Sequence, residues 1–385
     1  MPRPFRLAGS SFLLLVLATE QPAAQSPTSA RVVELPLDPS AWTATDSLRA
    51  DTFLGRRALY IDRGAAIAPG SDLRGGTLSF DMAATGQSTF LGVLFHARSP
   101  KDAEVVFFRV GESGTEDAVQ YAPALNSITS AWQVYHGPGA NAAAELPRER
   151  WIPVRIELAG DSATIFVGDS SAPTLVVPRL AGTGGRRVGV WAGGFGRGAW
   201  FSNLRYARAS EPAATPARAA PAGTIVEWEL SQAFDASELT PGTLPDLSRA
   251  TWERVRAEPQ GHVLVNRYRE APIARLPVDP ATRRVLRDSV MTGRVPGSKV
   301  VLARAVIEAE RDEVRRMRFG FSDGVVVYAN GQPLFFGMNP QFFLGQGIMQ
   351  WEGQAVYLPL RRGRNEIVLA VTEFTGGWAF FGRIE

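Results

Sequence analysis

Cysteine is absent from this 385-residue sequence. The absence excludes disulfide bonds and thiolate metal sites, and it also excludes the lipid-modified cysteine that anchors a bacterial lipoprotein. Histidine is scarce: His96, His136 and His262 are its only copies, and no two of them have metal-ligand spacing. A zinc site of the His-x-x-x-His kind is therefore excluded by sequence.

Concentrated charge and long hydrophobic runs are missing as well. Lysine occurs only at Lys101 and Lys299, the formal net charge is +3, and Lys+Arg 41 nearly balances Asp+Glu 38. No basic run is interleaved with aromatic residues along one expected face, so we expect no nucleic-acid partner. The apolar run from Phe12 to Ala18 is too short for a transmembrane helix, which needs roughly 20 residues, and we expect no membrane span.

The N-terminus has the three parts of a secretory signal. Arg3 and Arg6 form a positive region, the apolar run follows, and the small residues of 22–26 offer a cleavage site. We expect residues 1–25 to be removed as a signal peptide, so that the mature chain begins near Ser26. The sequence therefore predicts export to the periplasm or the cell exterior.

Length and composition predict two domains with separate hydrophobic cores. The segment 209–222 is rich in Ala and Pro and has almost no large apolar side chain, so it has nothing with which to offset the entropy of ordering. We interpret it as a linker between a domain at 31–208 and a domain at 223–385.

Short segments with alternating apolar residues recur on both sides of this linker. In the segment 151–158, for example, Ile152, Val154, Ile156 and Leu158 share one face, which is the period of a half-buried strand. Asn330-Gly331 predicts a hairpin, 363–365 another turn, and 279–287 one short helix. Many short strands with turn signals predict an all-β chain of two β-sandwich (jelly-roll) domains.

The first domain resembles the concanavalin A-like, laminin-G-like jelly rolls. The resemblance is carried by the segments 53–60 (FLGRRALY), 76–82 (GTLSFDM), 90–96 (FLGVLFH) and 189–191 (GVW), together with Trp151. Within that group it looks closest to the domains of 3-keto-disaccharide hydrolases, through 117–121 (DAVQY) and 132–137 (WQVYHG). The resemblance implies the sandwich fold and leaves the activity open.

The second domain resembles the galactose-binding-like β-sandwich that serves as an accessory module in glycosidases. The segments that carry this resemblance are 319–323 (FGFSD), 327–331 (VYANG), 358–365 (LPLRRGRN) and 376–380 (GGWAF). Much of it concerns the scaffold, so it does not imply that a sugar is bound.

No set of catalytic residues is recognisable. The only Glu-x-Asp, Glu310-Arg311-Asp312, lacks the third acid of the lectin-fold glucanases and falls in a segment that we expect to be an exposed hairpin. A Gly-x-Ser-x-Gly nucleophile elbow is also absent. Asp102 and Glu104 precede an apolar strand, where they are either a solvated strand start or a carboxylate pair able to supply an acid.

The richest polar and aromatic cluster lies between Gln120 and His136. A sugar presents an apolar face that packs on aromatic rings and hydroxyl groups that need amide, imidazole or guanidinium partners. The alternative is that these aromatic rings are core residues of the sandwich. The candidate ligand-binding residues are a platform of Tyr121, Trp132 and Tyr135, a rim of Asn126, Gln133, His136, His96 and Arg98, and the acid Glu104.

These observations favour a carbohydrate-binding protein. Two alternatives stay open: a sugar-cleaving enzyme of the 3-keto-disaccharide hydrolase type, with Glu104, His96 or His136 as acid or base, and a protein-interaction module of the cell envelope. We expect no cofactor. Laminin-G-like sandwiches can hold calcium, but the loop acids Asp72, Asp117 and Asp323 show no ligand spacing, so no metal site is assigned.

Overall fold

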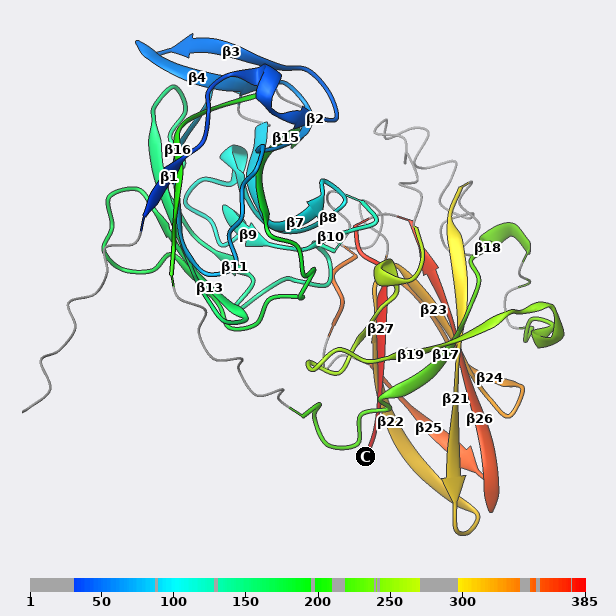
Figure 1. Ribbon diagram of the computed structural model, residues 1–385. Coiled ribbons are helices and arrows are strands. Elements are labelled where there is room, and N and C mark those ends of the chain that lie inside the picture. Colours follow the sequence, from blue (N-terminus) through cyan, green and yellow to red (C-terminus); the bar gives the residue numbers. More distant parts are fainter. Residues whose placement is uncertain are drawn as a thin grey trace, which may run out of the picture.

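The computed structural model describes residues 31–86, 89–127, 131–194, 198–209, 219–238, 240, 243–270, 297–339, 347–350, 354–374 and 376–385 (Figure 1). The predicted signal peptide, the predicted helix at 279–287 and residues 210–218 of the predicted linker lie outside these ranges. In the described part, every strand pairing is antiparallel, and no helix has the length and hydropathy needed to span a bilayer.

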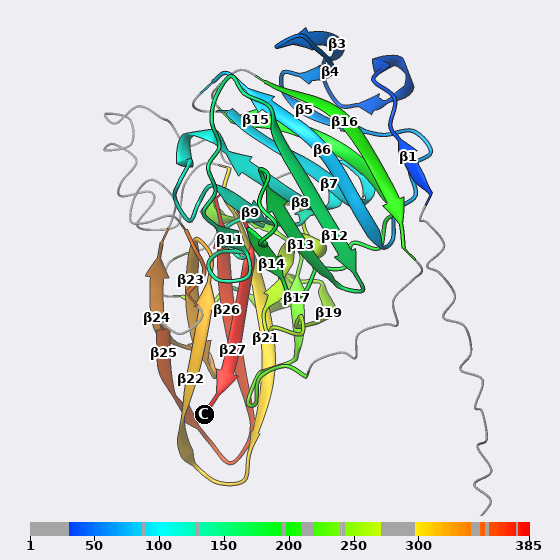
Figure 2. The same cartoon turned by 90° about the vertical axis from the view of Figure 1, so that its left-hand side faces the viewer.

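The residues before the linker form a sandwich of two sheets, which we call the N-terminal sandwich (Figure 2). Sheet A runs in the order β14 (Leu175–Val177), β13 (Ser162–Val167), β12 (Ile152–Ala159), β6 (Gly76–Ala84), β16 (Ala199–Arg208), β4 (Arg56–Ile61) and β3 (Leu48–Phe53), with β1 (Val32–Glu34) on β16. Sheet B runs in the order β11 (Asn141–Ala142), β9 (Val119–Tyr121), β8 (Asp102–Arg109), β7 (Thr89–Ser99), β15 (Arg187–Gly194), β5 (Gly64–Ile67) and β2 (Thr43–Ala44), with β10 (Ala124–Leu125) on β8. The 3-10 turn η1 (Pro39–Ala41) lies between β1 of sheet A and β2 of sheet B, and η2 (Val110–Glu112) lies between β8 and β9 of sheet B.

Residues after the linker form the C-terminal sandwich. Sheet D runs in the order β19 (Trp252–Arg256), β17 (Glu227–Ser231), β21 (Lys299–Ala309), β26 (Gly363–Glu373), β23 (Gly324–Ala329) and β24 (Gln332–Met338), with β18 (Phe234–Asp235) on β21. Sheet C runs in the order β20 (Val263–Leu264), β27 (Ala379–Ile384), β22 (Glu313–Phe321) and β25 (Gln354–Leu360). The turns η3 (Ala236–Glu238), η4 (Leu247–Arg249) and η5 (Val265–Arg267) lie between strands.

The alternation seen in the sequence explains how these strands pack. In β12, Ile152, Val154, Ile156 and Leu158 are buried between sheets A and B, while the residues between them are half-buried on the other face. The sandwich fold predicted from the sequence is confirmed: the chain is all-β, with jelly-roll sandwiches on both sides of residues 210–218.

The two turn predictions had different outcomes. Asn330 and Gly331 connect β23 to β24 with φ of 48° and 82°, so the predicted hairpin is confirmed. The second turn lies at 361–362, two residues before its predicted start, and Asn365 is a buried residue of β26. Its side chain accepts a hydrogen bond from the Arg361 N–H and donates to the carbonyls of Arg361 and Gly363, so it closes the turn from the adjoining strand.

The described residues of the segment 232–252, which are all except 239, 241 and 242, cover the outer face of sheet D. Beneath it, a separate apolar cluster is formed by Val300, Leu302, Tyr328, Val368 and Ala370, and Phe234, Leu244, Leu247 and Trp252 of the segment pack on that cluster. The Tyr328 hydroxyl donates to the Thr243 carbonyl at 2.9 Å. This irregular segment is therefore fixed to a rigid sheet.

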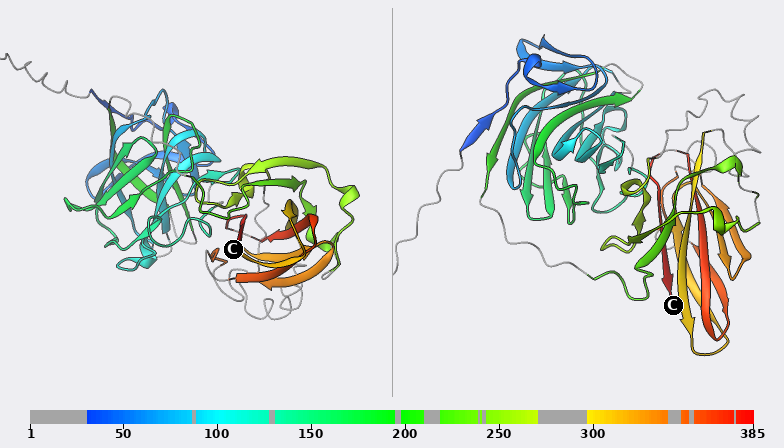
Figure 3. Two further views of the ribbon diagram at one scale, coloured as in Figure 1. Left: turned by 90° about the horizontal axis from the view of Figure 1, so that it is seen from below. Right: turned by 45° about the vertical axis from the view of Figure 1, so that its right-hand side comes forward.

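The two sandwiches are in contact at one end of sheet B (Figure 3). The apolar core of the N-terminal sandwich extends to Leu264, Met349, Ala379 and Phe381 of the C-terminal one. Both backbone polar groups of Gln133 form hydrogen bonds across this contact. Its N–H donates to the Gly376 carbonyl and its carbonyl accepts from the Met349 N–H, each at 3.0 Å. The cluster singled out in the sequence thus lies at the contact between the sandwiches.

Candidate functional site

Four of the predicted ligand-binding residues are buried at this contact. Glu104, Tyr121 and Gln133 have no exposed surface, and Tyr135 is 8% exposed. The rings of Tyr121 and Tyr135 meet edge to face at 5.3 Å, and Tyr135 meets His262 of the C-terminal sandwich in the same way at 6.0 Å. In this structure the rings form a ladder across the contact and offer no open face to a ligand.

Glu104 is the acceptor at the centre of this network. Its carboxylate accepts from the Tyr121 hydroxyl at 2.6 Å, from the N–H groups of Gly182 and Thr183 at 2.8 and 2.9 Å, and from the Thr183 hydroxyl at 3.2 Å. A buried carboxylate is stable only when such donors replace its water. Glu104 therefore fastens the loop before β15 to β8, and its oxygens face donors of the protein.

The C-terminal sandwich supplies the charges that face the ladder. Arg267 of η5 pairs with Glu258 at 2.5 Å and donates to the Ala181 carbonyl of the N-terminal sandwich. Burial and the Arg267 charge lower the pKa of His262 from 6.5 to about 3, so its ring is neutral at pH 7. Burial, followed by the Glu258 charge, raises the pKa of Tyr135 well above its usual range.

A buried carboxyl pair lies beside Gln133. The Gln133 amide donates to Asp323 at 3.4 Å, and the other Asp323 oxygen accepts from the Phe374 N–H at 2.7 Å. Burial, together with the Asp323 charge, raises the pKa of Glu373 well above its usual range. The raised pKa of Glu373 favours its protonated form beside the Asp323 carboxylate. Asp323 is the member of this pair that contacts the N-terminal sandwich, through Gln133.

The other predicted residues are spread over the surface. Trp132 is half-buried, and Asn126 donates to the Asn266 carbonyl across the contact. His136 lies 3.2 Å from an Asp117 oxygen. His96 and Arg98 lie at the far end of β7, where an ion pair joins Arg98 to Asp102 at 3.2 Å and the His96 ring lies 2.8 Å from the Arg74 carbonyl.

The structure therefore does not bring the nine predicted residues together in one open site. The C-terminal sandwich covers Gln133 and Tyr135, while Glu104 and Tyr121 lie beneath the loop before β15. This differs from the predicted sugar platform, and the physical reason is that Tyr135 packs on His262 while Asn126 and Gln133 donate hydrogen bonds to the C-terminal sandwich.

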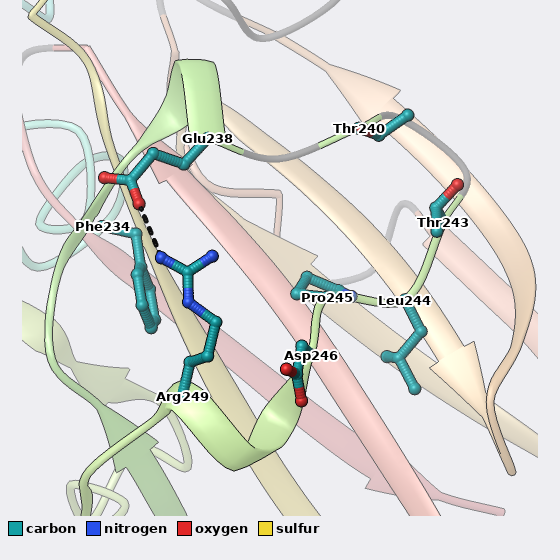
Figure 4. Close-up of a pocket in the computed structure, with 8 residues that line it drawn as sticks. All are labelled: Phe234, Glu238, Thr240, Thr243, Leu244, Pro245, Asp246 and Arg249. Atoms are coloured by element: carbon teal, nitrogen blue, oxygen red, sulfur yellow. Dashed lines mark ion pairs between the residues drawn. The ribbon is translucent and has the colours of Figure 1, made fainter.

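A pocket that the sequence did not indicate lies on the outer face of sheet D (Figure 4). It has a volume of about 200 Å³. Glu238 and Arg249 reach toward each other beside the Phe234 ring and pair at 3.5 Å, and both side chains are largely exposed. The residues that line the pocket are Phe234, Glu238, Thr240, Thr243, Leu244, Pro245, Asp246 and Arg249.

Two repeats of Asp-x-Ser position the charged pair. Asp235 accepts from the N–H and hydroxyl of Ser237 at 3.1 and 2.7 Å and so starts η3, which ends at Glu238. Asp246 does the same with Ser248 at the start of η4, which ends at Arg249. Hydrogen bonds from these serines lower the pKa of each aspartate, so both caps are charged at neutral pH.

The pocket combines the two kinds of surface that a small polar ligand needs. Phe234, Leu244 and Pro245 form an apolar wall, while a carboxylate and a guanidinium supply an acceptor and donors at the rim. The volume is below the roughly 300–1,000 Å³ of ordinary ligand pockets, which suits a single small ring. Within the described residues, no group of three or more His, Cys, Asp or Glu side chains is placed to hold a metal ion.

Comparison with known proteins finds only distant likenesses. No family model matches this chain, and no curated protein matches it. Among solved structures it is similar to the carbohydrate binding module CBM66 from Bacillus subtilis, with 14% identity over 43% of this chain and 96% of that chain and a TM-score of 0.33. A Bacillus subtilis protein with a galectin-like fold matches at 12% identity over 46% of this chain and 96% of its own, with a TM-score of 0.35. A native glycosidic hydrolase matches at 15% identity over 49% and 100%, with a TM-score of 0.33.

Proposed function

We propose that this chain is an exported carbohydrate-binding protein and that the pocket of Phe234, Glu238 and Arg249 holds one sugar ring. The observation that carries the proposal is the placement of an aromatic ring beside an exposed carboxylate–guanidinium pair. The apolar face of a sugar packs on the Phe234 ring. Two neighbouring hydroxyls bridge the rim, one donating to Glu238 and the other accepting from Arg249.

A rigid frame makes this arrangement suitable for recognition. The Gln232 side chain donates to the Arg249 carbonyl at 3.0 Å and accepts from the Thr251 N–H at 2.7 Å, which fixes the chain at the C-terminal end of η4. A preorganised pocket loses less entropy when it binds a ligand. Neither charged residue has to leave a buried position to meet a sugar.

Binding is favoured over cleavage because both acids that line the pocket are engaged by the protein: Glu238 pairs with Arg249, and Asp246 accepts from the N–H and hydroxyl of Ser248. Glu104, the acid expected in a hydrolase of the 3-keto-disaccharide type, accepts only internal hydrogen bonds in this structure. Release of reducing sugar by the purified protein would contradict this preference.

A glycan array on the mature chain, followed by calorimetric titration of the strongest ligand, tests the proposal. We expect Phe234→Ala and Arg249→Ala to weaken binding at least tenfold in a chain that stays folded, with a lower melting temperature for Phe234→Ala only, because its ring also packs on the apolar cluster of sheet D. Arg254→Ala, an exposed arginine on β19 that does not line the pocket, is the matched control and should bind as the parent does. An array without any glycan ligand, or equal affinities in all three variants, would contradict the proposal.

Export has its own test. The full-length chain should be expressed in a bacterium, and the N-terminus of the periplasmic product should be sequenced. We expect it to begin near Ser26. A product that keeps Met1 and stays in the cytoplasm would contradict this part of the proposal.

A further inference from the structure

The outer face of sheet C carries an arginine cluster that the pocket does not use. Residues 314, 316 and 318 of β22 point away from the core, while Met317 and Phe319, which alternate with them at the end of this run, are fully buried in it. The register places Tyr357 of β25 beside Arg316 and Arg383 of β27 beside Arg318. The face lies on strands β27, β22 and β25 (Figure 1).

Three arginines of this face converge on one carboxylate. The Glu385 carboxylate lies 3.2 Å from Arg316, 2.6 Å from Arg318 and 3.5 Å from Arg383. Three guanidinium groups thus share one side-chain carboxylate. The Glu385 group shows that a carboxylate fits among these guanidinium groups, which bind such groups with fixed geometry.

Apolar surface adjoins the arginines. Tyr357 is 69% exposed and Val314 is 66% exposed, which makes them the two most exposed large hydrophobic residues in the described part of the chain. An exposed aromatic ring next to excess positive charge is the combination that a ring-shaped anionic ligand requires. Neutral sugars gain little from such an excess of charge.

The charges around the face favour a short ligand. At one end of β22, the carboxylates of Glu310, Asp312 and Glu313 stand beside Arg311 and Arg315, which both pair with Glu313. At the other end, Phe381 of β27 is packed into the contact with the N-terminal sandwich. A long polyanion such as a nucleic acid would meet these carboxylates, so charge complementarity is confined to the middle of the face.

We propose that this face binds an acidic oligosaccharide. A uronic-acid carboxylate lies among Arg316, Arg318 and Arg383 beside Glu385, and the neighbouring sugar ring packs on Tyr357. The site is separate from the Phe234 pocket and takes a different class of glycan, so the two bind independently.

Calorimetric titration with trigalacturonic acid and with its neutral methyl ester tests this site. We expect the acid to bind more weakly as salt rises, and the ester to bind at least tenfold more weakly than the acid. Tyr357→Ala and Arg318→Ala should each lower affinity for the acid at least fivefold. Glu385→Gln should raise it several-fold, because the internal carboxylate no longer competes.

Two controls keep the result interpretable. Arg311→Ala removes an arginine that is 83% exposed on the adjacent turn, and Arg249→Ala disables the pocket; neither should change affinity for the acid. Loss of binding in Arg249→Ala alone would assign the acid to the pocket and overturn this proposal. So would equal binding of acid and ester, absence of binding to the acid, or stronger binding of a short single-stranded DNA that Tyr357→Ala does not weaken.

Discussion

Two groups of side chains in this molecule have the same chemical types and differ in their exposure to water. The contact network of Glu104, Tyr135 and Arg267 and the pocket of Glu238, Phe234 and Arg249 each combine a carboxylate, an aromatic ring and a guanidinium. In the network the carboxylate accepts four internal hydrogen bonds, and the arginine reaches a carbonyl of the opposite sandwich. In the pocket the carboxylate accepts one internal hydrogen bond, from the Asp235 N–H at 3.3 Å, and faces one exposed arginine.

The difference teaches that residue types do not distinguish a ligand site from a protein contact. A buried polar group must be satisfied by the protein, whereas an exposed one retains the capacity to bind something else. Counting the internal partners of each oxygen separates the two groups. The largest effects of mutation should therefore fall on the network, and the effects on ligand binding should fall on the pocket.

The largest effect is expected for Arg267→Ala. The substitution leaves Glu258 as a partly buried charge without its partner and removes a donor from the Ala181 carbonyl. Removing one member of a buried pair costs about 3 kcal/mol or more in the free energy of unfolding. Chemical denaturation checks this, with Arg256→Ala as control, because its pair with Glu227 is exposed and is worth less than about 1 kcal/mol. If both variants lost the same free energy of unfolding, the buried network would contribute no more to stability than an exposed ion pair does.

Glu104→Gln should have the next largest effect. One oxygen of Glu104 accepts from Tyr121 and the other from Gly182 and Thr183. The amide nitrogen of glutamine cannot accept a hydrogen bond, so the donors at whichever position it occupies lose their acceptor. We expect a loss of about 2 kcal/mol in the free energy of unfolding. Affinity for the glycan bound in the pocket should be unchanged. A stable Glu104→Gln protein that no longer binds or acts on sugar would give Glu104 a functional role instead.

Much of the fold could be predicted from the sequence because apolar residues alternate with polar ones along half-buried strands. The alternation around Ile152 and Ile156 locates β12, and the Asn330-Gly331 pair locates a hairpin by its need for positive φ. The turn near Arg361 was misplaced because Asn365 acts through its side chain from within β26. Such a contact depends on the adjoining strand and leaves no local pattern.

The site could not be predicted in the same way. The residue types of Trp132 and Gln133 suit both a sugar platform and a protein contact, and only the position of Gly376 and Met349, more than 200 residues later, decides between them. The pocket did leave a signal, the Asp-x-Ser repeats at 235–237 and 246–248. That signal predicts capped turns and says nothing about a ligand.

Acid should weaken the network through His262. The unfolded chain takes up a proton on this residue below pH 6.5, while the folded chain does not until pH falls to about 3. Stability is therefore complete well above pH 6.5 and decreases on acidification, by about 1 kcal/mol between pH 6.5 and 5.5. Glu373 has a raised pKa and acts with the opposite sign, so the measurement should compare the chain with His262→Gln. The same pH dependence in both proteins would exclude His262 as its source.

The smallest expected effects compare two tyrosine hydroxyls. Tyr121→Phe removes a donor from Glu104 and the acceptor of the Ala181 N–H, and we expect it to lower the free energy of unfolding by about 1 kcal/mol without changing glycan affinity. Tyr328→Phe removes only the bond to the Thr243 carbonyl, which is partly exposed, so stability should change by about 0.5 kcal/mol. Because Thr243 lines the pocket, this second variant should weaken glycan binding a few-fold. Titration and denaturation of both variants would show whether the network determines stability and the pocket determines recognition. If Tyr121→Phe weakened glycan binding and Tyr328→Phe did not, the network and not the pocket would bind the ligand.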